Sequence, residues 1–230
     1  MMKRITTTAL ILLLSSVLSS IGAEPIVLDD DKIAKSLSSK LGKIVDAGGI
    51  PTSKALSEQL VRKTCQLQLP IAAPQKKIDN VYGASLKSTV VISSIYKCDK
   101  CDDWHRGGGA TAWVLSSDGV MVTNYHIFKD KDVAAFGIRT YDGKVAPVME
   151  ILAASDLHDI AIFRVKGEGF EPFALGPDAG VGEAIHIIAH PDHRFYTYTS
   201  GNVSRYYKRV RGKRRVGATC LLYTSPSPRD

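Results

Sequence analysis

Residues 107–128 contain two short apolar runs separated by a polar turn sequence, which is the pattern of a β-hairpin. Residues 112–115 form its first apolar strand, and the Ser-Ser-Asp-Gly sequence at 116–119 supplies residues that favour a tight turn. Residues 120–122 are apolar again and form the return strand. The pattern therefore predicts a hairpin that ends just before His126.

A second apolar strand follows Asp159. Ile160, Ile162 and Val165 are spaced as in a buried or half-buried strand, so Asp159 stands where a loop enters it. His126 and Asp159 are thus both predicted at the junction of a strand and a loop. Short strands separated by turn residues indicate an all-β domain in this part of the chain.

The segment before residue 81 has a different, helical pattern. Apolar residues in 33–45 recur every three or four positions, which predicts an amphipathic helix that ends near Gly48 and Gly49. A second helix is predicted from Thr52 to Val61. Proline and small residues between 68 and 75 are typical of a connector. We therefore expect residues 24–80 to be a helical N-terminal extension joined by a connector to the all-β domain.

The first 23 residues have the layout of a secretory signal peptide. Lys3 and Arg4 precede an apolar run from Ala9 to Leu14, and a serine-rich stretch leads to Ala23. The run is shorter than a helix needs to span a bilayer. We expect cleavage after Ala23, periplasmic or secreted localisation, and no membrane association after cleavage.

The net charge of +7 comes from one segment. Seven arginines and lysines lie between residues 205 and 215, so the rest of the chain has no basic excess. Such a segment could bind phosphates, and Tyr206 and Tyr207 could stack on bases. A solvated hairpin that turns near Gly212 explains the same pattern, and we favour it. We therefore expect no nucleic-acid partner.

His126 and Asp159 are the candidate catalytic residues. A histidine that acts as a general base must be held in one tautomer, and a carboxylate on a separate rigid element is the usual means. The predicted strands supply such elements for both side chains. The spacing is therefore consistent with a base and its orienting acid.

Three motifs, in this order, resemble the trypsin-like serine endopeptidases, specifically the bacterial HtrA-like branch of the chymotrypsin fold. They are the hairpin with Thr123 and Asn124 before His126, the strand that Asp159 opens, and the segment 175–204 with its Leu-Gly, Val-Gly and Thr-Ser-Gly elements. The resemblance implies two six-stranded β-barrels, with residues 81–219 forming a truncated protease domain whose second barrel is incomplete. It also implies polypeptide substrates and no cofactor; oligomeric state is not implied.

The printed sequence has no Gly-Asn-Ser-Gly-Gly segment, which in this family carries the nucleophilic serine and the oxyanion hole. Residues 220–230 correspond to a translated DNA sequence that resembles a transposase sequencing adaptor, so we interpret them as an assembly artefact. On this interpretation the natural serine follows Thr219, and the chain as given is inactive. The alternative is a catalytically inactive trypsin-like module that binds peptides, a pseudoprotease.

Cys98 and Cys101 form a Cys-x-x-Cys motif with His105 close behind. In an oxidising compartment, a Cys98–Cys101 disulfide is the simpler interpretation, and we predict it with no metal site. A zinc site is the alternative, with Cys65 as the candidate fourth ligand. His186, His190 and His193 lack a nearby carboxylate cluster, so we interpret them as turn and strand residues.

Overall fold

The computed structural model describes residues 26–69, 78–211 and 213–222. The predicted signal peptide and most of the predicted connector lie outside these residues, as do residues 223–230 of the predicted artefact. No helix in the described part of the chain is both long enough and apolar enough to cross a membrane.

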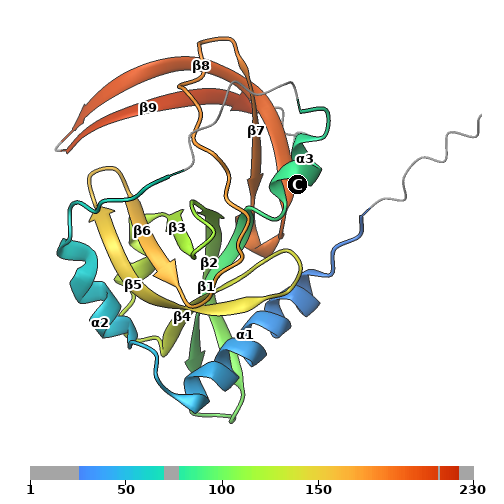
Figure 1. The fold of residues 1–230 in the computed structure, drawn as a ribbon, viewed down its shortest axis with the longest axis vertical. Coiled ribbons are helices and arrows are strands. Elements are labelled where there is room, and N and C mark those ends of the chain that lie inside the picture. The colour runs from blue at the N-terminus through green and yellow to red at the C-terminus, as the bar shows by residue number, and fades with distance from the viewer. Residues whose placement is uncertain (1–25, 70–77, 212, 223–230) are drawn as a thin grey trace, which may run out of the picture.

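Six antiparallel strands close into a barrel in the order β1-β2-β3-β6-β5-β4 (Figure 1). Closure leaves no free sheet edge, so every barrel strand pairs on both sides. The strands are β1 (Thr89–Lys97), β2 (Trp104–Val114), β3 (Val120–Thr123), β4 (Ala135–Arg139), β5 (Val145–Ser155) and β6 (Ile160–Val165).

The barrel interior is filled by aromatic and branched side chains. Phe128 packs edge-to-face against Phe136 and Phe163, with ring centroids 5.1 and 5.4 Å apart, and all three are fully buried. Such aromatic contacts add to the free energy gained by removing the rings from water. Phe128 directly follows the His126 segment, so this core also anchors the candidate site.

The predicted hairpin is confirmed. β2 ends at Val114 and β3 starts at Val120, and the backbone N–H of Leu115 donates to the Val120 carbonyl at 2.8 Å. Gly119 has φ +88°, and a side chain there would also press on the Val165 carbonyl. Glycine is therefore required at this turn by both its backbone angle and its surroundings.

The two N-terminal helices are also confirmed: α1 (Asp30–Ala47), and α2 (Ser53–Glu58) with the 3₁₀ turn η1 (Gln59–Val61). The Asp29 side chain caps α1 by accepting from the Lys32 backbone N–H at 2.9 Å. α1 lies across the outside of the barrel (Figure 1). Leu56 and Leu60, in contrast, belong to the barrel's own hydrophobic core. The helical segment is thus an integral part of the barrel's packing.

A second sheet curves over one end of the barrel (Figure 1). It contains β7 (Ala184–Ala189), β8 (Thr197–Arg211) and β9 (Lys213–Leu222), paired in that order. The shorter elements are α3 (Val81–Ser85), η2 (Tyr125–Lys129) and η3 (Pro191–His193). Arg211 pairs with Lys213, so the basic segment forms the predicted hairpin. The structure thus has the expected all-β class, with one closed barrel and a second, three-stranded sheet.

Candidate functional site

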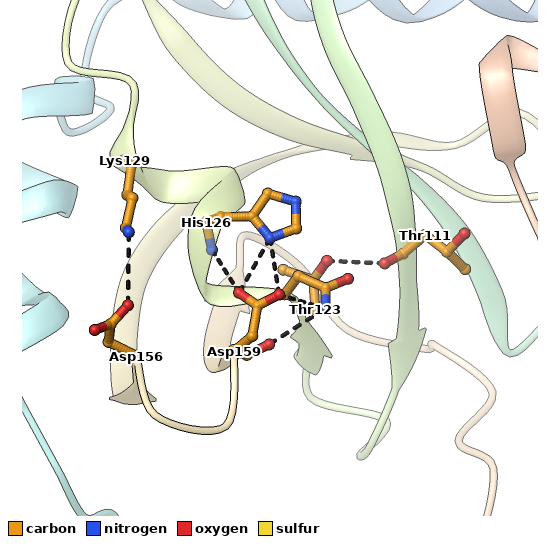
Figure 2. Close-up of polar contacts among 7 residues, drawn as sticks. Thr111, Thr123, His126, Lys129, Asp156 and Asp159 are labelled. Carbon is orange, nitrogen blue, oxygen red and sulfur yellow. Dashed lines mark hydrogen bonds and ion pairs between the residues drawn. The ribbon is translucent and has the colours of Figure 1, made fainter. Parts of the chain in front are cut away.

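His126 lies in η2, immediately after β3 ends at Thr123. The Thr123 hydroxyl donates to the Thr111 carbonyl at 2.8 Å, which ties the end of β3 to β2 (Figure 2). Two residues after His126, the ring of Phe128 is buried in the barrel core. The histidine therefore projects from a short segment that is fixed at both ends.

Asp159 stands at the tight connection between β5 and β6 and directly precedes β6. Its φ is +55°, a left-handed conformation that aspartate and asparagine tolerate better than most residues. This conformation belongs to the turn that brings the carboxylate beside η2. The sequence placed Asp159 at the start of a strand, and the structure agrees.

The two side chains meet directly. The His126 Nδ1 atom lies 2.9 and 3.0 Å from the two carboxylate oxygens of Asp159 (Figure 2). The backbone N–H of His126 also donates to Asp159 Oδ1 at 3.1 Å. Because an ionised carboxylate can only accept, this geometry requires a proton on Nδ1 and leaves Nε2 as the basic nitrogen of the neutral ring.

Asn124 is a site residue whose role sequence reasoning missed. Its side-chain amide donates to both the backbone carbonyl and the Oδ2 atom of Asp159, each at 3.2 Å. Asp159 is therefore held from two sides, by Asn124 and by His126. The available signal is the asparagine two positions before the histidine, which belongs to the motif before His126 but does not by itself indicate a contact with Asp159.

Partial burial raises the pKa of Asp159, but hydrogen bonds from the side chain and backbone of His126 outweigh this effect. The net pKa of Asp159 lies below its ordinary value, so the carboxylate is ionised at neutral pH. The His126 side chain is 59% exposed, which leaves it accessible from solvent. The arrangement can accept a proton at Nε2 and stabilise the resulting imidazolium.

A separate cavity of about 620 Å³ lies between the barrel and the second sheet. Its walls are mainly apolar and include Trp113 from β2, Leu175, and Ile185 and Ile187 from β7. Neither His126 nor Asp159 lines it. The candidate site is therefore defined by the contact between two side chains on an open surface.

Cys98, Cys101 and His105 converge at the tip of the β1–β2 hairpin. The two Sγ atoms are 3.3 Å apart, and His105 Nε2 lies 3.2 Å from Cys98 Sγ and 3.0 Å from Cys101 Sγ. A hydrogen bond from the backbone of Lys100, and a second from Cys101, lower the pKa of the Cys98 thiol to about 7. Both cysteines are free, and the disulfide stays a prediction.

The three later histidines do not meet. His186 Nδ1 lies 2.6 Å from the Tyr198 hydroxyl, while His190 is 4% exposed and accepts a hydrogen bond from the Tyr196 backbone. Burial lowers the pKa of His190 to about 4, so its ring is neutral. Within the described residues, the one group of three or more metal-ligating side chains is the cysteine and histidine cluster at the hairpin tip.

The structure resembles a solved protein described as the HtrA-type protease AlgW with decapeptide. The match has a TM-score of 0.52 and 14% sequence identity, and it covers 61% of this chain and 50% of that chain. This chain thus spans about half the length of that protein, and the likeness concerns the fold. A search of curated protein sequences finds no match.

The sequence itself matches the family described as trypsin-like peptidase domain over residues 110–228, more than half of the chain. The matched segment contains both His126 and Asp159 and continues into the second sheet. The chain therefore belongs to the trypsin-like peptidase domain family.

Proposed function

We propose that the natural protein is a serine endopeptidase of the HtrA-like branch, in which His126 is the general base and Asp159 its orienting acid. The observation that carries this proposal is the contact of His126 Nδ1 with both carboxylate oxygens of Asp159. The acid fixes the tautomer, so the proton acceptor is Nε2. Membership in the trypsin-like peptidase family supports the reaction class.

In the proposed mechanism, His126 Nε2 takes the proton of a serine hydroxyl as the serine oxygen attacks a peptide carbonyl. The imidazolium that forms is stabilised by the ionised Asp159, which keeps its negative charge. His126 then gives the proton to the leaving amine, and the acyl group stays bound to the serine oxygen as an ester. Water next gives a proton to Nε2 and attacks this ester, and the proton passes to the serine oxygen as the carboxylic acid product leaves. Asn124 holds the orientation of Asp159 by donating to its backbone carbonyl and to its Oδ2 atom.

The proposal assigns the serine to a natural segment that follows Thr219, with residues 81–219 as the truncated protease domain and residues 220–230 as the artefact. We also propose that residues 1–23 direct export and that the enzyme cleaves polypeptides in the periplasm or outside the cell. The solved HtrA-type protease holds a decapeptide, which supports a peptide as the ligand class. The chemistry needs no cofactor.

Recovery of the natural 3′ end of the gene tests the proposal directly. The full product, expressed without residues 1–23, should contain a serine in a glycine-rich context, hydrolyse unfolded polypeptides and react with a fluorophosphonate probe. Asp159→Asn should lower kcat/KM on the order of 10⁴-fold because the tautomer is no longer fixed. His193→Asn, at an exposed residue, is the matched control.

Two results would reject the endopeptidase. One is a complete gene that has no such serine, together with a product that binds peptides without cleaving them, which is the behaviour of the pseudoprotease. The other is a product that contains the serine but whose activity is unchanged by Asp159→Asn.

A further inference from the structure

The tip of the β1–β2 hairpin gathers three metal-ligating atoms onto one point. Cys98 directly follows the last residue of β1, Cys101 lies in the connecting loop, and His105 is the second residue of β2. Tyr96 pairs with His105 across the two strands, and their rings stack at a centroid distance of 5.5 Å. The imidazole is thereby aimed at the two sulfurs from a strand.

We propose that Cys98, Cys101 and His105 bind a Zn²⁺ ion. In a tetrahedral site with ordinary zinc bond lengths, two sulfurs are about 3.8 Å apart and a sulfur and a nitrogen about 3.5 Å apart. The three observed distances are 3.3, 3.2 and 3.0 Å, so the ligands need to open by only about half an ångström to admit the ion.

A Cys98–Cys101 disulfide explains the cluster less well. The bond requires the sulfurs to approach to about 2.05 Å, a larger movement in the opposite direction. It also leaves the position of His105 unexplained, because its Nε2 lies within hydrogen-bond distance of both sulfurs. A shared metal ion accounts for all three contacts at once.

The chemical types of the three ligand atoms indicate which metal ion the site binds. Two thiolates and one imidazole are a soft donor set that suits Zn²⁺, whereas Ca²⁺ and Mg²⁺ require oxygen ligands. Two thiolates also neutralise the charge of a divalent ion. Iron–sulfur clusters usually need four protein ligands, and three converge among the described side chains.

The site is expected to keep one exchangeable position. Cys101 is exposed, and the cluster within the described residues contains three ligating side chains, so water takes the fourth tetrahedral corner. Cys65 is not a member of the cluster. This makes Cys65 a matched control cysteine for every test of the site.

The bound ion would fix the hairpin tip against α1. Trp104, next to His105, donates from its indole nitrogen to Asp46 of α1 at 3.1 Å. Lys97, next to Cys98, lies over the Trp104 ring at 4.8 Å from its centroid. Zinc therefore stabilises a contact between the barrel and its helix, and this role does not depend on the proposed peptidase activity.

Titration of the reduced chain with Co²⁺, followed by displacement with Zn²⁺, measures the site. Wild type and Cys65→Ser should each bind one Co²⁺ and show the thiolate-to-metal charge-transfer absorption, which Zn²⁺ then removes. Cys98→Ser and His105→Ala should lose this absorption while their circular dichroism stays that of the folded chain.

Alkylation of the wild-type chain gives a second measurement that requires no variant. Zn²⁺ should slow the modification of Cys98 and Cys101, read for each residue by mass spectrometry, and leave Cys65 unchanged. The proposal is overturned if the reduced chain shows no charge-transfer absorption and no protection by zinc. It is equally overturned if Cys98→Ser and His105→Ala bind the metal as wild type does.

Discussion

Asp159 is subject to two opposing effects on its charge. Desolvation favours the neutral acid, whereas the hydrogen bonds from His126 and Asn124 favour the carboxylate. The hydrogen bonds have the larger combined effect, so the pKa of Asp159 lies below its ordinary value. A carboxyl group whose pKa is lower in the folded state stabilises the fold above its unfolded-state pKa of about 4. That contribution is lost as the pH falls through the lower, folded-state pKa.

We predict that His126→Ala raises the pKa of Asp159 relative to its pKa in the wild-type chain. The substitution removes the favourable hydrogen bond from the ring and leaves the desolvation largely in place. The measurement is a carbon-detected NMR titration of the Asp159 carboxyl group. His158→Ala removes an exposed neighbour and should leave the titration as in wild type.

Asn124→Ala should raise the pKa of Asp159 by less than His126→Ala does. The hydrogen bond from the Asn124 amide lowers the pKa of Asp159 less than the hydrogen bond from the His126 ring does. The same NMR titration compares the two variants. A shift in Asn124→Ala that equals or exceeds that in His126→Ala would contradict the assigned order.

At the level of secondary-structure elements, the contact between α1 and the barrel depends on a glycine. Gly42 is buried in the helix interior, where replacing glycine by alanine ordinarily stabilises by roughly 0.5–1 kcal/mol. Here a methyl group would overlap the indole of Trp104. The indole is also held by Asp46, so it has little room to move aside.

Gly42→Ala is therefore predicted to destabilise the fold, by about 1–3 kcal/mol, as expected for overpacking. Urea denaturation gives the free energy of unfolding. Lys43→Ala, at the exposed neighbouring position of the same helix, should change it by less than about 0.5 kcal/mol. A Gly42→Ala chain as stable as wild type would contradict this prediction, because it would show that the Trp104 indole moves aside without lowering the free energy of unfolding.

This contact also marks the limit of prediction from the sequence. The spacing of Leu37 and Leu41 predicted α1, and the turn residues before Val120 predicted the hairpin, because both signals are local. Nothing local to Gly42 indicates that Trp104, more than sixty positions later, packs on it. Likewise, periodicity did not reveal that Leu60 enters the barrel core.

In the candidate site, too, the sequence predicted the local features but not the contacts between distant residues. Motif order identified His126 and Asp159, and the structure places their side chains in contact. The role of Asn124 and the convergence of His105 with the two cysteines depend on strand register and turn geometry. The sequence indicated that His105 follows the two cysteines closely along the chain. A one-residue change of register would turn His105 to the opposite face of its strand, so the sequence alone could not show that the three side chains converge.

For the molecule as a whole, His190 joins three parts of the fold. It follows β7, its backbone N–H donates to the Thr111 hydroxyl of the barrel at 2.9 Å, and its ring packs against Phe195 and Tyr196. The Phe195 backbone in turn donates to Asp30 of α1 at 3.0 Å. A charge on the buried ring would therefore disturb the sheet, the barrel and the helix together.

We predict that His190 makes the stability of the chain fall between pH 6.5 and pH 4. The unfolded chain takes up a proton on this histidine near pH 6.5, but burial delays uptake in the folded chain until about pH 4. The loss across this window is up to about 3 kcal/mol.

His190→Asn keeps an acceptor for the Tyr196 N–H but cannot titrate, so its stability should depend less on pH. Urea denaturation at several pH values measures this, with His193→Asn as the exposed control that retains the wild-type slope. Equal slopes in His190→Asn and wild type would mean that the folded chain protonates His190 as readily as the unfolded chain does, and that this junction is open to water.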